Sequence, residues 1–215
     1  MTFRPLTVGV DLNKVILDTL GALHRLVCEV SGADIPPEQF SGKNCIGQSF
    51  STKPGGRVEA TAEHYKQAKY LFFETRRFCG EAQELPGAAK TCQRLVAEGH
   101  TIKLVTDVRG LPESWLRTWW HELKFPKNCE MHLTRGCSSK RKFYADCDVV
   151  IDNSIEHLLP LLKTEARLLL MLPAPGAVGS AVVTRPRDLD GSIITVRGWD
   201  QIYESICKIQ ESAAA

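Results

Sequence analysis

Apolar, strand-like runs alternate with stretches of helical periodicity along most of the chain. Strands are predicted at 7–12, 101–106, 131–133, 149–151, 167–172 and 193–196. Helices are predicted at 16–30, 86–96, 112–123, 155–163 and 199–209, with stops such as Ser31-Gly32 and Gly99. Strands that alternate with helices build a parallel sheet covered on both faces, so the pattern predicts an α/β fold.

The segment 33–84 interrupts this alternation. Turn-forming residues such as Pro36-Pro37 and Pro54-Gly55-Gly56 punctuate it, and apolar spacing predicts a helix over 57–78. We therefore expect a small helical cap inserted after the first strand-helix unit. The predicted division is a core made of 1–32 and 85–215, with the cap at 33–84.

Composition narrows the class of protein. The 215 residues are 43% hydrophobic, which suits one core with an insertion. The 27 Lys and Arg residues against 25 Asp and Glu leave a net charge of +2, which predicts neither a nucleic-acid nor a membrane partner. Eight scattered cysteines without a Cys-x-x-Cys pair indicate free thiols in a reducing compartment. With no leader or spanning segment recognised, a cytoplasmic location is expected.

Polar residues follow several of the predicted strands. Asp11 comes at the end of the first strand, with Asn13 and Lys14 just after it, and Thr106 ends a second strand. Asp152 and Asn153 end a third. Open α/β sheets bind ligands at the carboxyl ends of their strands, so these residues form a candidate site. A simple helix-capping role is the alternative for Asp11.

This order of positions resembles the haloacid dehalogenase (HAD) superfamily, whose core is a Rossmann-like sheet. The runs Val8-Gly9-Val10-Asp11, Leu85-Pro86-Gly87-Ala88, Leu104-Val105-Thr106 and 142–153 resemble its deoxyribonucleotidase-like 5'-nucleotidase branch. The resemblance implies that Asp11 is the nucleophile, that position 13 is the general acid, and that Thr106 and Lys142 hold phosphate. Lys140 is the rival of Lys142. The resemblance also implies Mg²⁺ between Asp11, the backbone carbonyl of Asn13 and position 153, with Asp152 nearby.

Three positions depart from the family pattern. The family has aspartate where this chain has Asn13 and Asn153, and glycine where it has Lys14. Each of these changes makes the charge of the site more positive by one unit. Hard cations lose affinity when an anionic ligand becomes neutral, so Mg²⁺ binding is predicted to be weak or absent. Loss of the general acid removes a contribution of typically ~10²–10⁴ in rate. Two interpretations of Asn13 and Asn153 are open: neutral drift, or a new role that has been retained. Two interpretations of Lys14 are also open: a solvated side chain, or an ammonium group that takes the place of the metal.

Three functional classes follow. The preferred one is a nucleotidase-like protein with strongly reduced or lost phosphatase activity, which binds a small phosphorylated ligand such as a nucleotide, or a protein partner. The second is an active phosphohydrolase that uses Asp11 as nucleophile. The third is a metal-free, dehalogenase-like hydrolase, because a halide needs no acid in order to leave.

Overall fold

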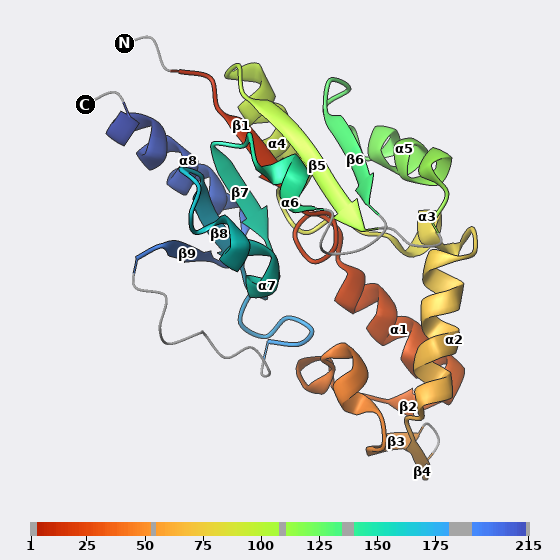
Figure 1. The fold of residues 1–215 in the computed structure, drawn as a ribbon. Coiled ribbons are helices and arrows are strands. Elements are labelled where there is room, and N and C mark those ends of the chain that lie inside the picture. Colours follow the sequence, from red (N-terminus) through yellow and green to blue (C-terminus); the bar gives the residue numbers. More distant parts are fainter. Residues whose placement is uncertain (1–3, 53–54, 108–110, 135–139, 181–190, 214–215) are drawn as a thin grey trace.

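A six-stranded parallel sheet forms the centre of the computed structural model, which describes residues 4–52, 55–107, 111–134, 140–180 and 191–213 (Figure 1). The strand order is β6-β5-β1-β7-β8-β9, and every neighbouring pair is parallel. The strands are β1 (Thr7–Val10), β5 (Thr101–Asp107), β6 (Glu130–Thr134), β7 (Val149–Asp152), β8 (Arg167–Met171) and β9 (Ile193–Val196). The predicted α/β fold with a Rossmann-like parallel sheet is confirmed.

Helices cover both faces of this sheet. They are α4 (Ala88–Ala97), α5 (Glu113–Glu122), α6 (Arg141–Tyr144), α7 (Ile155–Leu158), the 3₁₀ turn η4 (Leu159–Leu161) and α8 (Trp199–Ala213). Successive strand residues point to opposite faces. Val8 and Val10 therefore belong to one core with α4, α5 and α8, and Val105 and Val150 to a second core with α6 and α7.

Gly9 lies on the second face, where the ring of Tyr144 approaches the backbone of β1. A Cβ atom added at Gly9 would lie 2.8 Å from Cδ1 of Tyr144 and 2.9 Å from Sγ of Cys147. These distances are shorter than van der Waals contact, so only glycine fits without displacing the ring. Gly9 thereby allows the Tyr144 ring to pack closely against the backbone of β1.

The inserted segment contains a small sheet as well as helices. Its elements are β2 (Ala33–Asp34), η1 (Pro37–Gln39), η2 (Gly42–Cys45), β3 (Ser49–Thr52), β4 (Arg57–Glu59), α2 (Ala62–Phe73) and α3 (Arg77–Glu81). The strands pair as β2-β3-β4, antiparallel. The single helix predicted over 57–78 is therefore wrong. Thr61 caps α2 by accepting from the backbone nitrogen of His64, which leaves the preceding residues free to extend.

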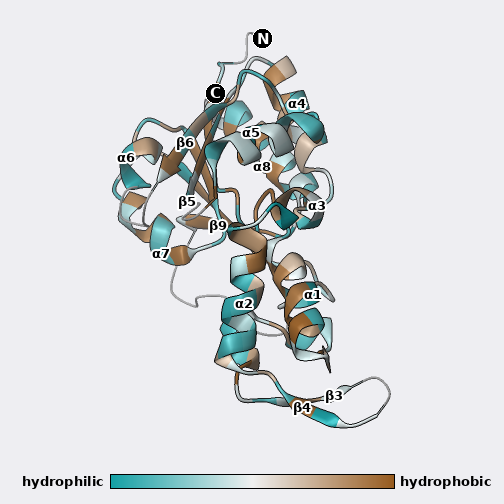
Figure 2. Ribbon diagram, turned by 90° about the vertical axis from the view of Figure 1, so that its right-hand side faces the viewer, coloured by the Kyte–Doolittle hydropathy of each residue, from teal (hydrophilic) through white to brown (hydrophobic). Residues whose placement is uncertain are grey.

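The first helix, α1 (Thr19–Ser31), packs mainly along α2 (Figures 1 and 2). It starts later than the sequence indicates because the Asp18 carboxylate caps it by accepting from Gly21 N at 2.8 Å. The two connections to the core run side by side, with backbone hydrogen bonds from Asp18 N to Gln83 O and from Leu85 N to Ile16 O. We propose that the insertion spans 18–84, so that α1 belongs to it rather than to the core.

Two further expectations can be compared with the described residues. None of the helices in the described ranges is long and apolar enough to cross a membrane. The seven cysteines that fall within these ranges are all free thiols, as the scattered spacing indicates.

Candidate functional site

Asp11 lies at the carboxyl end of β1 with only 3% of its surface exposed. Its backbone nitrogen donates to Ile151 O at 2.9 Å, which continues the pairing of β1 with β7. The Oδ1 atom accepts from Leu12 N at 2.8 Å and lies 2.8 Å from Nζ of Lys140. The sheet therefore fixes this carboxylate beside a buried ammonium group.

Asp152, at the end of β7, is fully buried and connects several side chains. Its Oδ2 atom lies 3.4 Å from Nζ of Lys140 and accepts from the Tyr144 hydroxyl at 3.2 Å. Its Oδ1 atom accepts from Ser154 N at 2.9 Å, and Nδ1 of His157 lies 3.0 Å away. Lys140 is thus held between the two carboxylates that end neighbouring strands.

The lysine that lies in this cluster is Lys140. The prediction that Lys142 lies at the site is therefore wrong. Lys142 is exposed, and its ammonium lies 4.6 Å from the ring centre of Phe143. Residues two apart on a helix point about 200° apart, so only one of the two lysines can face the sheet. Tyr144 lies four residues after Lys140, on the same face. This spacing of a lysine and a tyrosine is the signal that the sequence analysis missed.

Asn153 contacts both Asn13 and Asp11. With the Asn153 amide oriented to match its neighbours, Nδ2 donates to Asn13 O at 3.0 Å and to Asp11 Oδ2 at 3.1 Å. The side chain of Asn13 accepts from the Thr19 hydroxyl at 2.9 Å. The two oxygens that the resemblance assigns to Mg²⁺ are therefore joined by an amide group.

Thr106 lies one residue before the end of β5, the strand next to β1, and is completely buried. Its backbone carbonyl accepts from the Thr134 hydroxyl at 3.2 Å. Its own hydroxyl has no hydrogen-bond partner within the described ranges. An unpaired buried hydroxyl costs about 1–3 kcal/mol, and an oxygen of a bound ligand would remove that cost.

Burial and neighbouring charges set the ionisation of the cluster. Burial, together with Asp152, raises the pKa of Asp11 to about 6 against the opposing effect of Lys140. Burial opposes ionisation of Asp152 and of Lys140 as well. Even so, hydrogen bonds and opposite charges lower the pKa of Asp152 and raise that of Lys140. Lys140 and Asp152 are therefore charged at neutral pH, and Asp11 ionises near pH 6.

The structure brings together Asp11, Asn13, Asp152 and Asn153, with Lys140 in place of Lys142. Two members of the network, Tyr144 and His157, were not predicted, because neither belongs to a motif of the family. Within the described part of the chain, no group of three or more His, Cys, Asp or Glu side chains is placed to hold a metal ion.

Comparison with known proteins places the fold. No family model matches the sequence, and no curated protein matches it. Solved structures share the fold over nearly the whole chain. A protein from Clostridium acetobutylicum described as a predicted phosphatase has a TM-score of 0.57 at 13% identity, over 95% of this chain and 100% of its own.

Two further structures show the same fold. YfnB from Bacillus subtilis, named as a HAD hydrolase and bound to magnesium, has a TM-score of 0.56 at 13% identity, over 94% of this chain and 99% of its own. A structure described as a dehalogenase has a TM-score of 0.55 at 12% identity, over 94% and 97% of the two chains. The α/β core of this chain therefore has the same fold as these three structures.

Proposed function

We propose that this protein descends from Mg²⁺-dependent HAD phosphohydrolases of the deoxyribonucleotidase-like branch, and that it binds a small phosphorylated ligand with strongly reduced or lost phosphatase activity. The observation that carries the proposal is the Asn153 amide, which donates to Asp11 Oδ2 and to Asn13 O in the orientation that matches its neighbours. HAD-type hydrolases and phosphatases with the same fold support the ancestry.

The donor set around Asp11 fits Mg²⁺ poorly. Mg²⁺ demands oxygen ligands in near-octahedral geometry, and it is usually bound through one or two carboxylates. Here an N–H group faces the two oxygens, and Lys140 lies on the other oxygen of Asp11. The buried ammonium already offsets the carboxylate, so this chain supplies for itself part of the charge that the metal would supply.

Proton donation to a leaving group is also impaired at position 13. The amide of Asn13 has no titratable proton, and its oxygen accepts from the Thr19 hydroxyl. General acid catalysis requires a group that changes protonation state within reach of the leaving oxygen. An alkoxide such as that of a nucleoside would therefore leave slowly.

Binding of a phosphate group is better supported than its hydrolysis. Lys140 offers a buried positive charge, and the Thr106 hydroxyl offers a hydrogen-bond donor that the protein itself does not use within the described ranges. The Asp11 carboxylate would repel a phosphate once it is ionised. A neutral side chain at position 11 should therefore preserve or tighten binding.

Calorimetry with inorganic phosphate and nucleoside monophosphates, in the presence of chelator, tests the proposal. We expect binding without metal, equal or tighter binding by Asp11→Asn, and weaker binding by Lys140→Met and Thr106→Val. The exposed Lys142→Met is the matched control and should bind like the wild type. Robust Mg²⁺-dependent hydrolysis of a nucleoside monophosphate, abolished by Asp11→Asn, would establish an active phosphohydrolase instead.

A metal-free hydrolase of the dehalogenase type is the second candidate. Asp11 is a carboxylate that ionises near pH 6, and Lys140 and the Asn153 amide hold it in place without a metal. Such a carboxylate can displace a halide, which leaves without a proton. This candidate predicts chelator-insensitive halide release from 2-haloacids, abolished by Asp11→Asn.

A further inference from the structure

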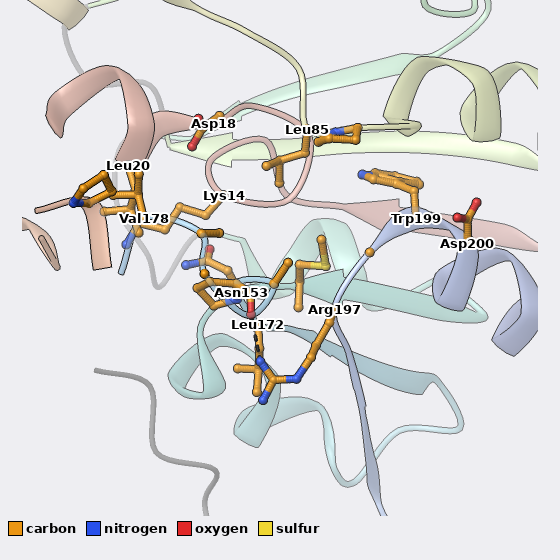
Figure 3. A pocket seen from close by; sticks show the side chains of 18 residues that line it. Lys14, Asp18, Leu20, Leu85, Asn153, Leu172, Val178, Arg197, Trp199 and Asp200 are labelled. Carbon is orange, nitrogen blue, oxygen red and sulfur yellow. Dashed lines mark hydrogen bonds between the residues drawn. The ribbon is translucent and has the colours of Figure 1, made fainter. Parts of the chain in front are cut away.

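A cavity of about 640 Å³ lies next to the Asp11 cluster (Figure 3). Its walls come from distant parts of the chain: residues 14–20, the connection at 85–86, the segment 171–178 that follows β8, and residues 197–200 at the start of α8. Small-molecule sites typically measure about 300–1,000 Å³ and are mostly apolar, with a few polar groups. The size and mixed origin of this cavity match that description.

Apolar side chains form most of the wall. They are Leu20, Leu85, Met171, Leu172, Val178 and Trp199. Trp199 is held rigidly because its indole nitrogen donates to Val15 O at 2.8 Å. A Cβ atom added at Gly198, which also lines the cavity, would meet no atom within 4 Å. The cavity therefore has open room beside a firm apolar wall, which favours a ligand with an apolar body.

Lys14 and Asn153 supply the polar end of the cavity (Figure 3). Lys14 has a left-handed backbone, with φ 62°, and its nitrogen donates to Leu17 O at 2.8 Å, which fixes the turn that presents the side chain. Lys14 forms no ion pair with any residue that the structure describes, and desolvation lowers its pKa against the effect of Asp11. The ammonium group is thus placed to meet an anion in the cavity.

Two of the other charged residues of the cavity, Asp18 and Arg197, already serve the protein itself, and the third, Asp200, lies in the first turn of α8. The Asp18 carboxylate caps α1 at Gly21 N. Nη1 of Arg197 donates to Pro173 O at 2.8 Å. Asp11 does not line the cavity, whereas Asn153 lines it and contacts Asp11 Oδ2. The Lys14 end is therefore distinct from the Asp11–Lys140 pair.

We propose that this cavity binds a small amphipathic anion, with its carboxylate or phosphate head on Lys14 and its aromatic or branched apolar body against the wall that includes Leu85 and Trp199. The site goes beyond the proposed function, because its charge comes from Lys14 rather than from Lys140. The apolar body would contribute burial of nonpolar surface, and the charged head a charge-assisted hydrogen bond.

Calorimetry with three matched probes tests this site: 2-naphthoate, 2-naphthyl phosphate and the neutral 2-naphthol. We expect both anions to bind and 2-naphthol to bind about tenfold more weakly, as loss of one charged hydrogen bond predicts. Lys14→Met should remove this preference for anions. Gly198→Leu, which fills the cavity, should weaken the binding of all three probes. The exposed Lys90→Met on α4 serves as control.

Further variants separate the cavity from the Asp11 cluster. Lys140→Met should leave the binding of 2-naphthoate unchanged, even if it weakens the binding of inorganic phosphate. Val178→Trp is a second filling variant if circular dichroism shows that Gly198→Leu is unfolded. The proposal is overturned if neither anion binds at millimolar concentration. It is also overturned if binding depends on Lys140 but not on Lys14 or on the filling variants.

Discussion

In the orientation of the Asn153 amide that matches its neighbours, its nitrogen lies 3.1 Å from Oδ2 of Asp11, so a hydrogen bond from an uncharged donor joins the ends of β7 and β1. The same nitrogen reaches Asn13 O at 3.0 Å. An aspartate at position 153 would place a carboxylate against these two acceptors, and only a cation between them could relieve the repulsion. This contact therefore relates the sequence change at position 153 to the need for a metal.

Asn153→Asp should make the stability of the protein depend on Mg²⁺. In chelator, we expect a lower melting temperature than for the wild type, because like charges then face each other without a counterion. Added Mg²⁺ should restore it, because a ligand that binds only the folded state stabilises that state. The melting temperature of the wild type and of the exposed control Asn128→Asp should hardly respond. An equally large response of the wild type would contradict our account of the metal position.

Lys140→Met should be far more destabilising than Lys142→Met. Removing one partner of a buried ion pair typically costs about 3–5 kcal/mol, because the remaining charges stay buried without compensation. Here two carboxylates, Asp11 and Asp152, would lose their shared cation. An exposed substitution such as that of Lys142 usually changes the free energy of unfolding by less than about 0.5 kcal/mol. Urea denaturation of both variants measures the difference, and equal effects would show that the two lysines have been wrongly distinguished.

The stability of the wild type relative to Asp11→Asn should fall between about pH 4 and pH 6. Folding raises the pKa of Asp11 from 3.8 to about 6, so the folded state binds this proton more tightly than the unfolded state does. The resulting stabilisation is complete below the unfolded pKa and is lost as the pH rises through the folded pKa. The expected change is on the order of 1–3 kcal/mol. Urea denaturation across this pH range measures the change in the free energy of unfolding. Asp11→Asn should remove this pH dependence, whereas the exposed control Asp34→Asn should leave it unchanged.

Lys14→Gly should stabilise the protein slightly while weakening anion binding in the cavity. Lys14 and Lys124 are the two non-glycine residues with positive φ in the described ranges, at 62° and 59°. This conformation costs an L-residue about 1–2 kcal/mol, which glycine avoids, although the greater freedom of glycine in the unfolded chain offsets about 0.4–1 kcal/mol. Lys124→Gly is the matched control, with a similar gain in the free energy of unfolding and no effect on ligand binding. Unequal gains would show that Lys14 is held by more than its backbone.

The sequence by itself determined the order of the strands in the core and of most of its helices, although not the short helix α6. Parallel strands such as 101–107 and 149–152 are built around short runs of Ile, Leu and Val, so they can be recognised without tertiary information. The residues Asp11, Thr106 and Asp152 could be found for the same reason, because each follows directly after such a run. The inserted segment was harder to predict, since its strands are short and partly exposed and its helix boundaries depend on caps at Asp18 and Thr61.

Only the tertiary structure decided which side chains complete the site. Lys140 and Lys142 are equivalent in sequence, and the choice between them depends on which face of a four-residue helix packs on the sheet. Tyr144 reaches Asp152 because Gly9, far away in the chain, leaves room for its ring. The sequence revealed that Asn153 is neutral, but not that its amide faces Asp11. Such contacts depend on distances between separate strands, and a linear pattern of apolar and polar residues does not contain them.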